Sequence, residues 1–91
     1  MPRIDIEREH HLGTAAARDV VDKVAAAMQE KFGLSHQWRG DVLHFSGTGV
    51  TGSIAVSAQA VHVAAQLGLL LSPLKGRIEQ DIRQRLDRYF A

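Results

Sequence analysis

The chain has 91 residues and no cysteine, so we expect one domain over residues 1–91 and no disulfide, thiolate metal site or cysteine nucleophile. Its formal net charge of +1 argues against nucleic acid as a partner, because a phosphate-binding surface needs a concentrated basic excess. No apolar run approaches the roughly 20 residues that span a bilayer, and the first residues lack an apolar signal region. We therefore expect a soluble, cytoplasmic protein.

The first predicted element is a strand over residues 3–9. Polar and apolar side chains alternate there, which places Ile4 and Ile6 on the inward face. The outward positions are carboxylates that we expect to be solvated: Asp5, Glu7 and Glu9.

A long helix is predicted next, over residues 15–32. Its apolar side chains recur every three or four positions, which is typical of a helix with one buried face. Gly13 or Thr14 is expected to cap its start, and Gly33 its end. The positions expected to be buried are Ala17, Val20, Val21, Val24, Ala25, Met28 and Phe32.

Four short strands follow. They are predicted at residues 34–39, 42–46, 54–56 and 61–67, and short turns join the last three. The last three carry apolar side chains at alternate positions, so together they favour an antiparallel meander with a continuous apolar face.

The letters GTGVTG at residues 47–52 match a dinucleotide-binding loop, but their surroundings favour a hairpin. A dinucleotide loop needs a helix directly after the glycines, whereas residues 53–57 alternate like a strand. The acidic residue expected about 20 positions further on is also missing. Glycine accepts the positive φ angles of a tight turn, so we predict a hairpin here.

The last predicted element is a helix that begins at Ser72 and Pro73, with the serine as its cap. Two series of alternating charges, four residues apart, are expected to form its solvated face. Its apolar side chains form a narrow stripe: Leu74, Ile78, Ile82, Leu86 and Phe90. The whole order is β-α-β-β-β-β-α, and we predict an α+β two-layer sandwich, helix-grip-like, with both helices on one face of an antiparallel sheet.

Five histidines invite a search for a metal or catalytic site, and the pattern favours neither. His10 and His11 end the first strand and point to opposite faces, so they are expected to be solvated rather than to chelate one metal. His44 and His62 are expected on the outer sheet face, two strand spacings apart. His36 is expected to pack beside Trp38. No nucleophile elbow or triad spacing appears, so we expect no catalytic residue, no metal, no cofactor and no enzyme activity.

Two surfaces remain as candidates for contact. The outer sheet face, with His44 and His62 at its flanks and small side chains between them, is either plain solvent-exposed surface or the interface of a homodimer. The second surface is the leucine-rich connection before the last helix, which is either a plug at the end of the core or an exposed apolar edge. Its candidate contact residues are Leu67, Leu69, Leu70, Leu71 and Leu74.

Four segments together resemble the putative polyhydroxyalkanoic acid system protein family. They are Arg8 to Gly13, Lys31 to Gly33, Phe45 to Gly52, and Leu67 to Leu70, the last continued by Lys75, Ile78, Glu79, Ile82, Leu86 and Asp87. Members are encoded near bacterial polyester-synthesis genes, and the resemblance covers nearly the whole chain. It implies an association with storage polyester or its granules, or with polyhydroxyalkanoate-synthesis proteins, and it supplies no catalytic residue.

The sequence therefore leaves three function classes. The first is a non-enzymatic accessory or granule-associated protein. The second is a small carrier of an acyl or other apolar ligand, which predicts a cavity beneath Trp38, Phe45 and Ile82. The third is an enzyme, which would need a polar cluster that the pattern does not indicate.

Overall fold

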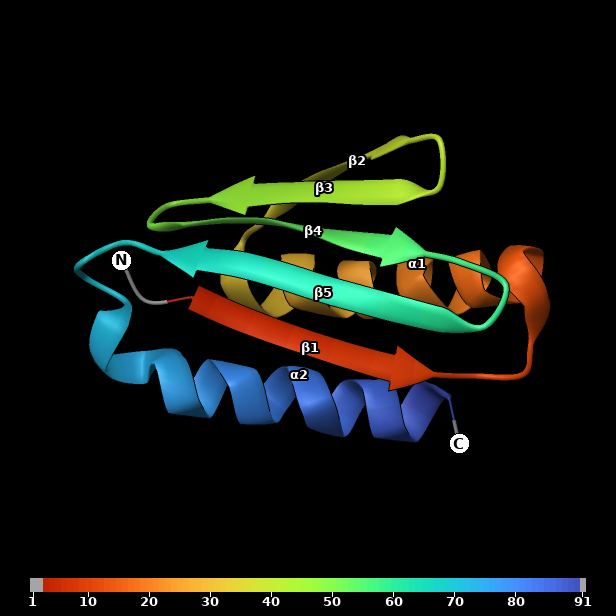
Figure 1. Ribbon diagram of the computed structural model, residues 1–91. Coiled ribbons are helices and arrows are strands. Elements are labelled where there is room, and N and C mark those ends of the chain that lie inside the picture. Colours follow the sequence, from red (N-terminus) through yellow and green to blue (C-terminus); the bar gives the residue numbers. More distant parts are fainter. Residues whose placement is uncertain (1–2, 91) are drawn as a thin grey trace.

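A computed structural model describes residues 3–90, and these form one five-stranded sheet with two helices on one face (Figure 1). The elements are β1 (Arg3–Glu9), α1 (Gly13–Phe32), β2 (Ser35–Arg39), β3 (Val42–Gly47), β4 (Val50–Val56), β5 (Ala60–Leu67), a 3₁₀ turn (Ser72–Leu74) and α2 (Lys75–Tyr89). The predicted α+β class and the order of its strands and helices are confirmed.

The strands lie in the order β1-β5-β4-β3-β2, and every neighbouring pair is antiparallel. The predicted meander of β3 to β5 is confirmed, and β2 extends it by pairing with β3. β1 joins it at the β5 edge, where Ile4 lies opposite Ala65 and Ile6 lies opposite Val63. This register puts the apolar side chains of both strands on the same face, because side chains on a strand alternate with a period of two.

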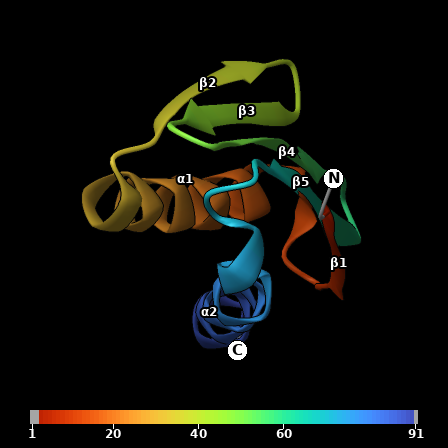
Figure 2. The same ribbon diagram turned by 90° about the vertical axis from the view of Figure 1, so that its left-hand side faces the viewer.

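Both helices pack on that apolar face. Figure 2 shows α2 end-on with α1 crossing it, both on one side of the curved sheet, while no described segment covers the other side. α1 contacts β2 and β4, and α2 contacts β1 and α1. The largest fully buried side chains come from both layers: Ile4, Val21, Val24, Leu43, Val61, Val63, Leu67 and Leu86.

The glycine-rich segment forms the predicted hairpin between β3 and β4. Gly49 has φ +80°, which a turn residue with a side chain rarely adopts. Gly52 lies within β4, where a Cβ atom would sit 2.4 Å from the Ala64 carbonyl oxygen and 2.6 Å from Cζ of Phe45. The third glycine of the motif therefore makes room for packing, and no phosphate loop is formed.

Only the C-terminal end of α1 is capped as predicted. Gly33 has φ 69° and donates its N–H to the Gln29 carbonyl at 2.8 Å, which is the expected left-handed cap. At the other end the helix begins at Gly13, and Leu12 holds the capping position without a side-chain hydrogen bond. The predicted cap by Gly13 or Thr14 is therefore wrong.

The start of α2 also differs from the prediction. Ser72 and Pro73 form a 3₁₀ turn, and the α-helix begins only at Lys75, with no side chain capping it. Its charged face is not wholly solvated, because Asp81 lies between the helices and accepts a 2.6 Å hydrogen bond from Lys31 Nζ. These charges therefore fix α2 against α1 as well as facing water.

Candidate functional site

The connection between β5 and α2 divides its leucines between the core and the surface. Leu67 ends β5 and is fully buried, and Leu71 packs partly buried against the core. Leu69 and Leu70 are 87% and 84% exposed, and Leu74 is 44% exposed. Of the five predicted contact residues, Leu67 is therefore inaccessible at the surface, and Leu69 and Leu70 are the most available.

The two exposed leucines stand on a well-ordered turn, which we call the leucine turn (residues 68–74). Gly68 donates its N–H to the Gly49 carbonyl at 2.7 Å, which ties the turn to the β3–β4 hairpin. The Leu71 and Ser72 amides then both donate to the Gly68 carbonyl, at 3.1 and 3.0 Å. Because the backbone is held from within and Leu71 anchors it, Leu69 and Leu70 are presented outward by the fold.

More apolar surface lies at the same end of the molecule. Phe32, the last residue of α1, is 40% exposed, although its spacing predicted burial. Figure 1 shows the end of α1, the leucine turn and the start of α2 at one end of the sheet. We call this region the apolar end; its exposed apolar side chains are Phe32, Leu69, Leu70 and Leu74.

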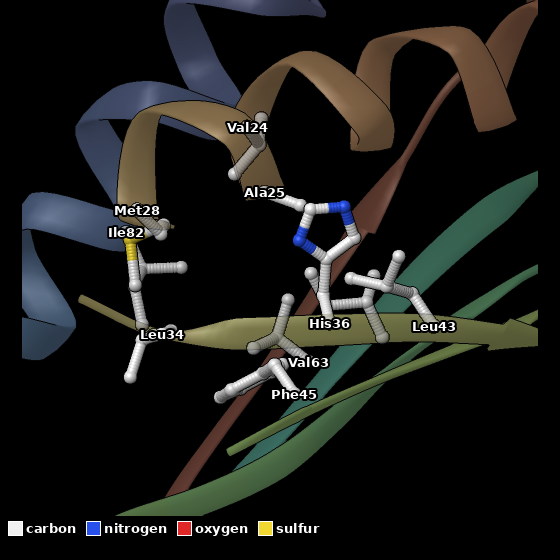
Figure 3. A pocket seen from close by; sticks show the side chains of 10 residues that line it. Val24, Ala25, Met28, Leu34, His36, Leu43, Phe45, Val63 and Ile82 are labelled. Carbon is white, nitrogen blue, oxygen red and sulfur yellow. The ribbon is translucent and has the colours of Figure 1, made fainter. Parts of the chain in front are cut away.

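A small apolar cavity lies between α1 and the sheet. Its volume is about 20 Å³, which is room for about one water molecule. Phe45 and Ile82 line it as predicted for a carrier, and His36 reaches into it from β2 toward Ala25 (Figure 3). Trp38 does not line it. The indole N–H instead donates to Asp22 at 2.6 Å.

His10 is buried, and its predicted solvation is wrong. The ring is 4% exposed and stacks on Phe90 with a centroid distance of 5.4 Å. Nδ1 accepts the Leu12 N–H at 3.2 Å, so Nε2 carries the proton and donates to the Ser57 carbonyl at 3.0 Å. His10 thus joins three segments of the fold and is fully engaged in doing so.

The other histidines do not form a metal site. His11 and His44 are exposed, and His62 lies on the outer sheet face as predicted. Within residues 3–90 no group of three or more His, Cys, Asp or Glu side chains is close enough to hold a metal ion.

The outer sheet face carries one short polar contact. His62 Nε2 donates to Asp5 Oδ1 at 2.5 Å, across the paired strands β1 and β5. This hydrogen bond lowers the pKa of the Asp5 carboxyl below its ordinary value. Nothing in the described structure covers the face, and homodimer formation through it stays a prediction.

A model of the putative polyhydroxyalkanoic acid system protein family matches residues 4–90. The chain belongs to this family. The matched region of this chain contains the apolar end, the small cavity and His10. Searches of curated proteins and of solved structures gave no significant match.

The polyhydroxyalkanoic acid system family was expected from the sequence, but two features of this member were missed. The period of two that places Ile4 and Ile6 inward also places His10 inward. The burial of His10 could therefore have been predicted from the pattern. The exposure of Phe32 has no such signal, because its spacing on α1 is that of a buried position. No helix within residues 3–90 has the length and apolar character needed to cross a bilayer.

Proposed function

We propose that this member of the polyhydroxyalkanoic acid system family is a non-enzymatic accessory protein that binds the apolar surface of storage-polyester granules. The contact is made by the leucine turn, chiefly by Leu69 and Leu70. The observation that carries the proposal is that a hydrogen-bonded turn holds both side chains more than four-fifths exposed. An ordered turn with two adjacent exposed leucines is unusual on a surface that only meets water.

The charge distribution supports the same contact. No residue from Leu67 to Leu74 carries a charge, so no ion has to be dehydrated when the turn meets an apolar surface. Burial of a leucine side chain contributes about 1.5–3 kcal/mol, so Leu69 and Leu70 together would contribute roughly 3–6 kcal/mol to an apolar contact. Leu74 and Phe32 add further apolar area at the rim.

The non-enzymatic part of the proposal rests on what the polar groups do. His10 holds three segments of the fold together, and His62 pairs with Asp5 on an open sheet face. Asp81 fixes α2 to α1 through Lys31. We therefore assign these side chains to stabilising the fold rather than to catalysis.

The test is co-sedimentation of the purified protein with poly-3-hydroxybutyrate particles at moderate salt. We expect the wild type to be retained and the double variant Leu69→Ser, Leu70→Ser to remain in the supernatant. Raised salt should leave retention unchanged, because screening weakens contacts between charges and leaves apolar contacts intact. Leu12→Ser is the matched control, since Leu12 is also exposed but lies in the β1–α1 connection at the opposite end.

Either of two results would overturn the proposal. Equal retention of the wild type and the double variant would mean that the leucine turn is not the contact. No retention of the wild type would instead favour contact with a polyhydroxyalkanoate-synthesis protein over direct contact with the polymer. Circular dichroism of each variant is the control that its fold is intact.

A further inference from the structure

A second, deeper apolar feature opens beside the leucine turn. It is a groove of about 130 Å³ between the end of α1, the start of α2 and the β3–β4 hairpin. Thr48 supplies the one polar side chain among the residues that line it. The remaining walls include Met28, Phe32, Val50, Leu71 and Ile78.

The groove and the small cavity are neighbours. Met28, Leu34, Phe45 and Ile82 line both spaces, so these side chains form the wall between them. Methionine is unbranched and flexible, so Met28 can adjust to join the two spaces at little cost. With Met28 moved aside, the two spaces would form one apolar channel, wider at the groove and narrower at its inner end.

The dimensions and lining restrict what such a channel can hold. A cavity of roughly 150 Å³ lined by apolar side chains accommodates benzene, so the groove takes a group of about six carbon atoms. The inner space of about 20 Å³ is too small for a ring but admits the end of a linear chain. Thr48 in the groove and His36 in the inner space are the polar side chains among the lining residues, and the other walls are apolar, so charged groups are excluded from the interior.

A cationic group lies beside Phe32, one of the residues that line the groove. Lys31 Nζ lies 5.4 Å from the ring centroid of Phe32, which lines the groove, and its side chain is about half exposed. The ammonium has three donors and bonds Asp81 at 2.6 Å, so it keeps donors for a second oxygen. An anionic head group at the mouth would therefore meet Lys31 while its chain occupies the groove.

We propose that this groove is a binding site for an unbranched medium-chain monocarboxylate, with the aliphatic chain directed toward Met28 and the carboxylate at Lys31. The site adjoins the leucine turn through Leu71, but Leu69 and Leu70 do not line it, so it does not depend on polymer binding. A side chain of a second copy is the competing occupant. The narrow inner end favours the linear chain over a branched or aromatic side chain.

The test uses the two methionines of the chain, Met1 and Met28, labelled with ¹³C in their methyl groups. Titration with octanoate should shift the Met28 methyl signal in a saturable way. Acetate, which has the carboxylate without the chain, should leave it unmoved. No shift with octanoate, an equal shift with acetate, or a shift produced by raising the protein concentration alone would overturn the proposal.

A pair of variants locates the site. Thr48→Phe places a ring over the mouth from an exposed turn position and should weaken octanoate binding at least about tenfold. Thr51→Phe makes the same change on the outer sheet face, where binding should be unaffected. Equal affinity in both variants would overturn the assignment. The double variant Leu69→Ser, Leu70→Ser should bind octanoate normally, so failure at the groove and failure at the turn are distinguishable.

Discussion

The two ends of the sheet depart from the usual distribution of side chains in opposite directions. At the apolar end Leu69 and Leu70 face water, whereas at the other end the polar ring of His10 is buried. The backbone around both is hydrogen-bonded, so neither departure reflects a poorly formed loop. Buried polar and exposed apolar groups are the informative exceptions in a small domain. Here the buried histidine serves the fold, and we propose that the exposed leucines serve a contact.

From this contrast we expect the largest loss of stability when His10 is substituted. His10→Ala leaves the Ser57 carbonyl and the Leu12 N–H without their partner and removes the packing on Phe90. We expect the free energy of unfolding in urea to fall by roughly 2–4 kcal/mol. His11→Ala, at the exposed neighbouring position, should change it by less than about 0.5 kcal/mol. Similar values for the two variants would show that His10 does not hold this end together.

A smaller effect is expected within the leucine turn. Leu71→Ala removes the side chain that anchors the turn beside Gly49 and should lower the free energy of unfolding by about 1–3 kcal/mol. Leu70→Ala should leave it within about 0.5 kcal/mol, because the side chain is exposed. Urea unfolding of both variants measures the difference. A destabilised Leu70→Ala would mean that this leucine serves the fold rather than a contact.

The smallest effect is expected in the pH dependence of stability, through Asp5 and His62 on the outer sheet face. The His62 hydrogen bond lowers the pKa of Asp5, so its stabilising contribution is complete above the ordinary value of 3.8 and is lost as the pH falls through the lower folded-state value. Asp5→Asn should therefore reduce the acid sensitivity of unfolding below about pH 4, slightly, because the pair is exposed to solvent. An unchanged pH profile would contradict this assignment.

The periodicity of the sequence was enough to predict every strand and both helices. It could not predict which strand pairs with β1, because alternation fixes the face of a strand and not its neighbour. The pairing with β5 is what brings Asp5 to His62, and with it the hydrogen bond that lowers the pKa of the Asp5 carboxyl. The register of β1 also brings Arg8 to Asp87 of α2, a contact between residues far apart in the sequence.

Only part of the candidate site could be predicted, because contacts between distant segments decide the rest. The sequence indicated that the leucine-rich segment is too apolar for an ordinary connection, and both interpretations hold for different residues: Leu67 and Leu71 close the core, and Leu69 and Leu70 face outward. The division depends on the Gly68 amide bonding to Gly49, a contact between two turns. The groove was missed because its walls come from both helices and from three strands of the sheet.

The most direct test of the central claim uses the absence of cysteine from the chain. A polarity-sensitive fluorophore is attached to Leu70→Cys in the leucine turn, and in a second sample to Leu12→Cys at the opposite end. On addition of poly-3-hydroxybutyrate particles, we predict a blue shift of emission from position 70 and none from position 12. No shift at position 70, or equal shifts at both positions, would contradict a contact made by the leucine turn.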